Sequence, residues 1–341
     1  MDSHGVSWFR GPILGKGSFG SVFMATLKKP KFNTTLFPPV MAVKSAMVSS
    51  SASLQREKEI LDDLRGCPFV LECFGEETTT RANGEMVYNL LIEYASGGTL
   101  GDIIDESKGC GLPEIAVRHY TRCILEGISH IHECGYVHCD LKPDNILLLP
   151  TEGGKFVVKI ADLGLAKRSR QSKKQRVDCC MRGTPLYLAP ETVVEHLQES
   201  PSDIWALGCV VLEMLTGRQA WDLNPNCSTQ QLYVKIGSEK SIPEIPAWIS
   251  EEGKDFLRKC FVRKPMFRFT AEMLLDNPFV HGVNEEIFRE LKGEYCSSEE
   301  NSSLSCGDYF YRSVGEVASG IQRRRRRSSV GSTVTVDEGK Q

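Results

Sequence analysis

The chain has 341 residues, enough for one large domain or for two lobes followed by a tail. Hydrophobic residues make up 41% and charged residues 25%, so most of the chain should be globular rather than disordered. The formal net charge of −3 argues against a protein that coats nucleic acid through its overall charge, and we expect no nucleic-acid partner.

The 13 cysteines contain no CxxC pair, and the opening stretch MDSHGVSWFRG has no apolar run. We therefore expect reduced thiols, no secretory leader and a cytoplasmic location. The longest apolar stretch, WALGCVV at residues 205–211, is much shorter than the roughly 20 residues of a membrane span, so no membrane partner is expected.

The first 50 residues alternate strand-like segments with Gly and Pro. The segments WFRGPIL, SVFMATL and PPVMAVKSAM predict three antiparallel strands, with LKKPKFNTTLFPP as a long connection between the last two. Residues 53–65 predict a helix packed on this sheet. Its apolar face consists of Leu54, Ile60, Leu61 and Leu64.

Helical patterns dominate after a further predicted strand, VYNLLIEY, and the flexible stretch ASGG. We predict an α+β protein in which a β-rich first lobe joins an α-rich second lobe. The final part, from about residue 297 to residue 341, is polar and rich in Ser, and its charges stand in blocks of one sign. This composition predicts a disordered tail. The predicted helices of the second lobe cover residues 113–134, 202–216, 251–261 and 270–276.

The stretch LGKGSFGSV at residues 14–22 contains GxGxxG, which most often belongs to a dinucleotide-binding fold, where a helix follows. Here the strand pattern SVFMA follows, so we predict a strand–turn–strand flap. Its glycines would let backbone amides approach phosphates, and Val22 would cover a base. Lys44 in MAVKSAM could simply face solvent, but Glu57 on the predicted helix could pair with it and direct it toward phosphates.

The stretch HCDLKPDNILLL at residues 138–149 has the spacing of a phosphoryl-transfer loop. Asp140 would accept the proton of a substrate hydroxyl, Lys142 would lie near the transferred phosphoryl group, and Asn145 would hold a metal ion. In VKIADLG, Asp162 follows an apolar strand and would chelate Mg²⁺. The competing interpretation is a metal site of soft ligands in HIHECGYVHC: His130, His132, Cys134, His138 and Cys139.

With these motifs, the chain resembles a eukaryotic protein kinase over about residues 8–281. GTPLYLAPE at residues 183–191 resembles the end of an activation segment, and SDIWALG at 202–208 resembles the helix whose buried Asp supports the catalytic loop. Lys142 and Thr184 resemble the serine/threonine branch, whose substrates carry an alcohol. The chain is most similar to the MEKK-type MAP kinase kinase kinases, particularly the short plant stress-signalling members.

The resemblance implies ATP and Mg²⁺ as cofactors, with Asn145 and Asp162 as metal ligands. It implies an extension (1–7), an N-lobe (8–94), a hinge (95–98), a C-lobe (99–281) and a tail (282–341). The backbone of Glu93 and Ala95 would bind adenine, Ile92 would guard the pocket behind it, and Arg268 would pair with Glu191. The implied ATP-binding residues are Leu14, Gly15, Lys16, Gly17, Ser18, Phe19, Gly20, Ser21, Val22, Ala42, Lys44, Glu93, Ala95 and Leu147.

Two residues depart from the family pattern. Cys139 replaces an Arg that, in most relatives, pairs with a phosphate on the activation segment, and Leu163 replaces the commoner Phe. Neither position touches ATP, metal or hydroxyl, so we expect an active enzyme. The alternatives are a pseudokinase that serves as a binding scaffold, and a P-loop hydrolase, which would need GKS or GKT after the glycines.

Two basic runs leave their roles open. The activation-segment run is either a solvated face or a patch that recruits an acidic substrate, and Ser169, Ser172 and Thr184 are candidate phosphosites. Arginines 323–327 precede Ser328 and Ser329. They are either a solvated tail or a nuclear-import signal, and a basophilic phosphorylation site is compatible with both. The activation-segment run comprises Lys167, Arg168, Arg170, Lys173, Lys174 and Arg176.

Overall fold

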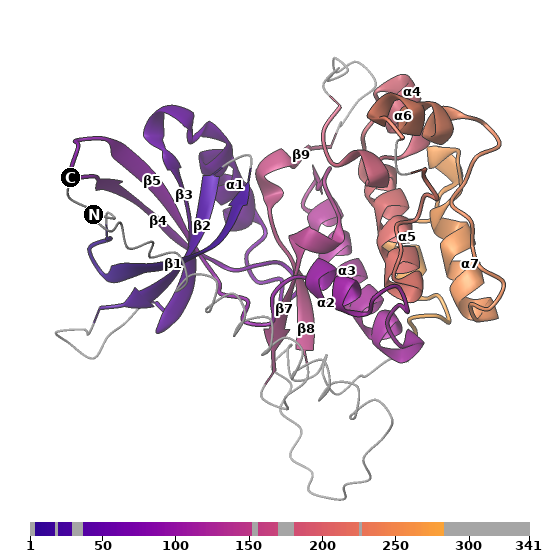
Figure 1. The fold of residues 1–341 in the computed structure, drawn as a ribbon, viewed down its shortest axis with the longest axis horizontal. Coiled ribbons are helices and arrows are strands. Elements are labelled where there is room, and N and C mark those ends of the chain that lie inside the picture. Colours follow the sequence, from indigo (N-terminus) through magenta and orange to yellow (C-terminus); the bar gives the residue numbers. More distant parts are fainter. Residues whose placement is uncertain are drawn as a thin grey trace, which may run out of the picture.

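The computed structural model describes residues 4–17, 20–28, 37–151, 156–169, 181–224 and 227–282. A lobe built on a twisted sheet lies beside a larger helical lobe, and a short connection joins them (Figure 1). The predicted α+β, two-lobed architecture is confirmed. Ser18, Phe19, Ser172, most of the activation-segment basic run and the predicted tail from residue 283 onward lie outside the described residues.

The first lobe contains a five-stranded antiparallel sheet in the order β1-β2-β3-β5-β4. The three predicted N-terminal strands and the strand at VYNLLIEY are confirmed. The strand CFGEETTT was not predicted, because its polar residues have no apolar alternation and it forms only by pairing along its neighbour. The strands are β1 (Trp8–Gly17), β2 (Gly20–Leu27), β3 (Val40–Met47), β4 (Cys73–Thr80) and β5 (Met86–Ile92).

Helix α1 (Ala52–Asp63) packs on this sheet, as predicted. Its buried face carries the expected Leu54, Ile60 and Leu61, and it also buries Glu57. A carboxylate on the apolar face of a helix is costly unless a cation meets it, so the position of Glu57 already points to a partner across the interface.

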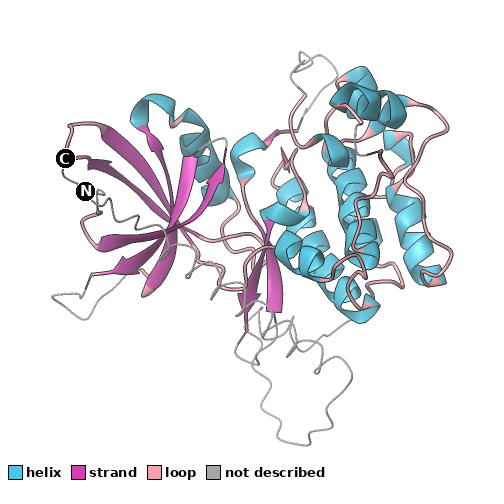
Figure 2. Cartoon of the chain, in the orientation of Figure 1, coloured by secondary structure: helices cyan, strands magenta, loops and turns pink. Residues whose placement is uncertain are grey.

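The second lobe is mostly helical (Figure 2), and it is built around α5 (Ser200–Thr216), most of whose residues are buried. The four predicted helices are present, each shifted by two residues or fewer. Three short helices were not predicted, since each has too few apolar residues to show a period. The remaining helices are α2 (Leu100–Glu106), α3 (Glu114–Glu133), α4 (Pro190–Glu195), α6 (Thr229–Gly237), α7 (Glu251–Cys260) and α8 (Ala271–Leu275). Among the described residues, none of these helices is long and apolar enough to cross a membrane.

Two short pairs of antiparallel strands position the loops that lie between the lobes. In one pair β6 (Tyr136–Val137) lies beside β9 (Lys167–Arg168), and in the other β7 (Ile146–Pro150) lies beside β8 (Phe156–Ile160). Ile146 pairs with Ile160, and the Ala161 amide donates to the Asn145 carbonyl at 2.8 Å. The residue before β7 and the residues after β8 therefore lie side by side. This register brings Asn145 next to Asp162.

The predicted ion pair between Glu191 and Arg268 is confirmed. Both side chains are buried, and the guanidinium meets the carboxylate through two bonds of 2.7 and 2.9 Å. A bidentate pair satisfies both charges away from water, and it ties α4 to the segment after α7.

Candidate active site

The cleft between the lobes holds a cavity of about 630 Å³, a size typical of a small-molecule site. Gly20, Val22 and Met24 alternate along β2 and line it, whereas Ser21 faces the other side of the sheet and does not. Ser18 and Phe19 lie outside the described residues. The other predicted ATP-binding residues all line the cavity: Leu14, Gly15, Lys16, Gly17, Ala42, Lys44, Glu93, Ala95 and Leu147.

The glycines of the flap have two different roles. Gly15 and Gly17 line the cavity and have open space where a side chain would begin, so a ligand can approach their backbone. Gly20 has φ +144°, and a Cβ there would lie 2.4 Å from the Ser45 carbonyl of β3. Only glycine therefore allows β2 to begin its pairing at this point.

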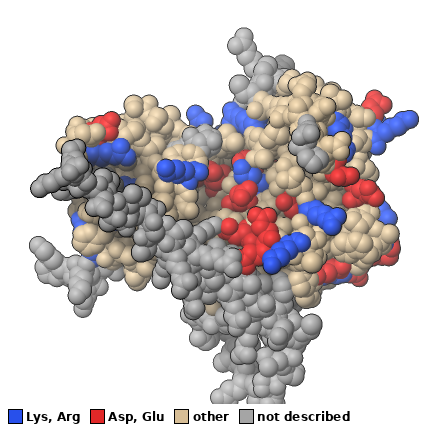
Figure 3. All heavy atoms as spheres, in the orientation of Figure 1, with Lys and Arg blue, Asp and Glu red and all other residues tan. Residues whose placement is uncertain are grey.

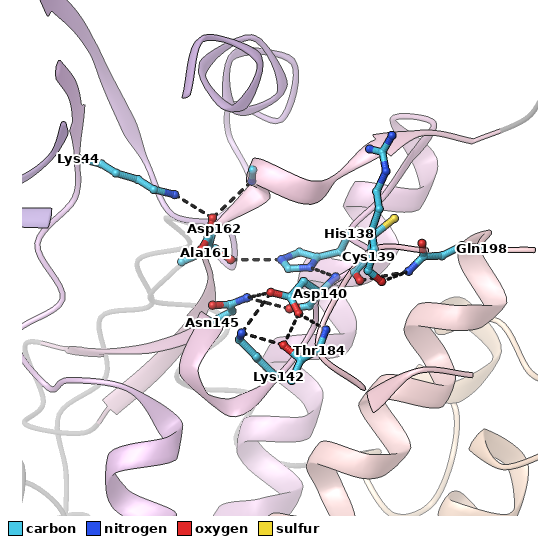
Figure 4. Close-up of polar contacts among 12 residues, drawn as sticks. Lys44, His138, Cys139, Asp140, Lys142, Asn145, Ala161, Asp162, Thr184 and Gln198 are labelled. Carbon is cyan, nitrogen blue, oxygen red and sulfur yellow. Dashed lines mark hydrogen bonds and ion pairs between the residues drawn. The ribbon is translucent and has the colours of Figure 1, made fainter. Parts of the chain in front are cut away.

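Lys44 joins the two lobes at the back of the cavity. Its ammonium lies 2.7 Å from Glu57 of α1 and 2.8 Å from Asp162 (Figure 4 shows the second contact). Burial alone would lower the pKa of Lys44, but the two carboxylates outweigh it and raise the pKa. Burial raises the pKa of Glu57 against the effect of Lys44. One cation between two carboxylates leaves an excess of negative charge at this end of the cavity.

Asp162 occupies a left-handed backbone conformation, with φ +59°. Its carboxylate accepts the Gly164 amide at 3.4 Å, a local bond of the kind that makes Asp tolerant of this conformation. Burial alone would raise the pKa of Asp162, but the Lys44 charge outweighs it and lowers the pKa. The carboxylate is therefore charged and faces the cavity.

Donors from the catalytic loop and from the activation segment hold the Asp140 carboxylate (Figure 4). One carboxylate oxygen accepts the Thr184 amide at 2.8 Å and the Thr184 hydroxyl at 2.7 Å. The other accepts the Asn145 side-chain nitrogen at 3.1 Å and lies 3.2 Å from the Lys142 ammonium, which also donates to the Thr184 hydroxyl at 2.9 Å. The carboxylate is fixed in place, as a proton acceptor must be.

Asp203 of α5 supports this loop from below, as predicted. Its carboxylate accepts the backbone amides of His138 at 2.8 Å and Cys139 at 3.0 Å, and a ring N–H of His132 at 2.9 Å. Burial alone would raise the pKa of Asp203, but these bonds outweigh it and lower the pKa. A buried anion thus sets the backbone of the residues before Asp140.

The histidines and cysteines of HIHECGYVHC have structural partners. His132 binds Asp203, and His138 donates through Nε2 to the Ala161 carbonyl at 3.2 Å and accepts the Asp140 amide at 3.2 Å through Nδ1. Within the ranges that the structure describes, no group of three or more His, Cys, Asp or Glu is placed to hold a metal ion. The competing soft-metal interpretation is therefore wrong for this stretch.

Lys159, whose role the sequence did not predict, binds Glu93 at the edge of the hinge. Lys159 of β8 binds both carboxylate oxygens of Glu93, at 2.8 and 3.0 Å. Glu93 lines the cavity, and its backbone amide is already used, because it donates to the Glu72 carbonyl at 2.9 Å. No sequence motif marks Lys159, because its role follows from the strand register.

Comparisons with known proteins agree with this geometry. A family model described as "Protein kinase domain" matches residues 8–280. The chain belongs to the protein kinase family. It is 45% identical to mitogen-activated protein kinase kinase kinase 20 of Arabidopsis thaliana, over 84% of this chain and 81% of that protein. It is 40% identical to mitogen-activated protein kinase kinase kinase 17 of the same species, over 81% of this chain and 70% of that protein. It is 38% identical to mitogen-activated protein kinase kinase kinase 18, also of that species, over 92% of this chain and 87% of that protein.

The protein is an ATP-dependent serine/threonine kinase, and the donor set fits its cofactors. Asn145 lines the cavity, and because its side-chain nitrogen donates to Asp140, its amide oxygen is the atom that would bind a metal ion. That oxygen and the Asp162 carboxylate are the hard ligands that Mg²⁺ prefers, beside the excess negative charge described above. When bound, Mg²⁺ would neutralise charge on the phosphates of ATP.

The kinase retains two departures from the family pattern. Leu163 is fully buried under α1, where an apolar residue is required. Cys139 is buried, and burial strongly raises the pKa of its thiol, so the side chain is neutral. A neutral thiol cannot balance a phosphate.

The basic run at the start of the activation segment is largely paired where it is described. Lys167 lies 3.2 Å from Glu199, and Arg168 lies 3.1 Å from Asp63 and stacks over the Tyr136 ring. The face beside the cleft is acidic instead, with Asp and Glu side chains gathered over α2 (Figure 3). Lys167 is largely enclosed by its pairing, whereas the Arg168 side chain stays mostly exposed, so the role of the run in recruiting an acidic substrate stays a prediction.

The buried charge of Asp203 predicts a specific pH dependence. Because its folded pKa is lowered, its charge stabilises the fold fully above the unfolded pKa of about 3.9, and this contribution declines as the pH falls from there through the lowered folded pKa. Asp203→Asn should lower the free energy of unfolding by about 3 kcal/mol at pH 7, and by about 0.7 kcal/mol less at pH 3.5, where Asp203 of the unfolded chain is mostly protonated. Urea unfolding at both pH values measures the difference.

The exposed Asp276 at the end of α8 provides the matched control, because Asp276→Asn makes the same chemical change without a buried partner. The lowered pKa of Asp203 would be contradicted if the difference in free energy of unfolding between wild type and Asp203→Asn were the same at pH 7 and at pH 3.5.

Proposed function

We propose that this kinase phosphorylates MAP kinase kinases and so acts as a MAP kinase kinase kinase in a stress-signalling cascade. The observation that carries the proposal is the match to three MAP kinase kinase kinases over 70% or more of their own lengths. A similarity that covers most of each protein includes the surfaces that meet a protein substrate as well as the nucleotide site.

The site residues divide the transfer among themselves. Asp140 would accept the proton of the substrate hydroxyl as its oxygen attacks the γ-phosphorus of ATP, and Lys142 would stabilise the transferred phosphoryl group. Lys44, held by Glu57, would orient the remaining phosphates, and Asn145 and Asp162 would hold Mg²⁺. Catalysis then consists of positioning and electrostatic stabilisation rather than covalent chemistry by the protein.

Among the residues that the structure describes, no feature of the site favours the scaffold alternative. The two departures from the family pattern, Cys139 and Leu163, are buried residues that support the loops, and the ammonium, proton-acceptor and metal-ligand candidates Lys44, Asp140, Asn145 and Asp162 all line the cavity.

The direct test is transfer of labelled γ-phosphate to a generic acceptor and to a panel of MAP kinase kinases. Asp140→Asn should lower kcat by at least about 100-fold, because the proton acceptor is lost, while the Kd for ATP stays nearly unchanged. Asp276→Asn should behave as wild type. Equal labelling by wild type and Asp140→Asn would indicate a contaminating kinase and sink the proposed activity.

We also propose that activity depends little on phosphorylation of the activation segment, because neutral Cys139 cannot balance the charge of roughly −2 on a phosphate. Phosphatase treatment of the purified kinase should lower kcat by less than about threefold. A loss of tenfold or more that rephosphorylation restores would refute this proposal.

We propose a cytoplasmic kinase whose Arg323–327 run also serves nuclear import. These residues lie outside the described ranges, so the proposal rests on the sequence. A variant truncated after Gly320 should lose its nuclear signal in imaging of the tagged protein, and an unchanged nuclear signal would remove the import proposal.

A further inference from the structure

A buried glutamine links the catalytic loop to the end of the activation segment. Gln198, just before α5, is 5% exposed. Its side-chain nitrogen donates to the Cys139 carbonyl at 3.2 Å and to the Arg182 carbonyl at 3.0 Å (Figure 4 shows the bond to Cys139). An amide nitrogen carries two hydrogens, so one side chain satisfies both carbonyls and joins the two segments.

The backbone at Cys139 is shaped for this contact. Cys139 has φ +69°, a conformation uncommon for a residue with a side chain, and its amide is held by Asp203. Gly183, which follows Arg182, has φ +102°, and a Cβ there would lie 2.3 Å from the Cys139 carbonyl oxygen. The activation segment therefore passes in direct contact with this carbonyl. Gln198 fixes the distance between the activation segment and the catalytic loop.

The linked residues flank the reacting group on both sides. Cys139 directly precedes Asp140, and Arg182 is two residues before Thr184, whose amide and hydroxyl both bind the Asp140 carboxylate. If the Gln198 bonds were absent, the backbone that carries Asp140 and the segment that carries Thr184 would each lose one hydrogen bond that holds them together. An error of about 1 Å in such a group is enough to slow transfer markedly.

The residue next to Gln198 holds the other end of the activation segment. Glu199 pairs with Lys167, at the start of the segment, at 3.2 Å. The Arg182 guanidinium also reaches back to the Leu165 carbonyl at 3.3 Å. Both described ends of the segment are thus attached to residues 198–199 and to each other by bonds that involve no phosphate.

We propose that Gln198 is a positioning residue that holds the activation segment against the catalytic loop, the task that the family resemblance assigns to an Arg and a phosphate. The neutral amide does so through its two hydrogen bonds, independently of phosphorylation. The proposal rests on the phosphoryl-transfer activity above but not on the identity of the substrate, so a generic acceptor suffices to test it.

The test compares Gln198→Glu and Gln198→Met with wild type after phosphatase treatment. Glu places a carboxylate against two carbonyl oxygens, whereas Met keeps the length of the side chain and removes only the donors. We expect kcat to fall at least about tenfold for Glu and at least about threefold for Met, while the KM for ATP stays within about twofold, because the cavity wall is untouched. Gln231→Glu is the matched control, because the exposed Gln231 caps α6 by accepting a bond that Glu accepts equally well.

Hydrogen exchange separates positioning from general damage. The amides of residues 138–142 and 181–189 should exchange faster in both Gln198 variants, while those of β3 and β5 should not change. A Gln198→Met enzyme within about twofold of wild-type kcat would overturn the proposal, as would a kcat loss matched by weaker ATP binding and faster exchange throughout the chain. An inactive wild-type enzyme would instead overturn the proposed function.

Discussion

The contact of the Lys44 ammonium with Glu57 and Asp162 is the interaction on which the site depends. It joins β3, α1 and the turn after β8, elements far apart in the sequence, so it fixes the rotation of α1 and the position of the first lobe relative to the second. Burying the charges of Lys44 and Glu57 is costly, and it is tolerated because the ammonium lies within 2.8 Å of both Glu57 and the more exposed Asp162. The remaining negative charge suits a site for a divalent cation and a triphosphate.

A second buried charge organises the lower side of the cleft. Asp203 binds two consecutive backbone amides of the catalytic loop, so helix α5, most of whose residues are buried, sets the loop directly. Gln198 extends this support to the activation segment. The side chains that would touch substrate thus depend on neighbours that would not, with Asp203 on α5 and Gln198 just before it.

The sequence predicted the fold where apolar periodicity was strong and the site where motifs were complete. Helix α1 was predicted at residues 53–65 because four apolar residues share one face. The motif HCDLKPDN indicated that Asp140, Lys142 and Asn145 lie together. Strand β4 escaped prediction because pairing with β5 stabilises it, and α2 and α6 escaped because side-chain caps mark their starts without a long apolar period. Lys159 and Gln198 escaped because strand register and backbone carbonyl directions decide their contacts, and neither is written in a motif.

The most direct measurement of the central claim is a crystal structure of the phosphatase-treated kinase with a non-hydrolysable ATP analogue and Mg²⁺. The account predicts that Lys44 keeps its contact with Glu57 while facing the phosphates, and that the metal binds Asn145 and Asp162. A nucleotide bound outside the cleft, or a metal held by neither residue, would contradict it.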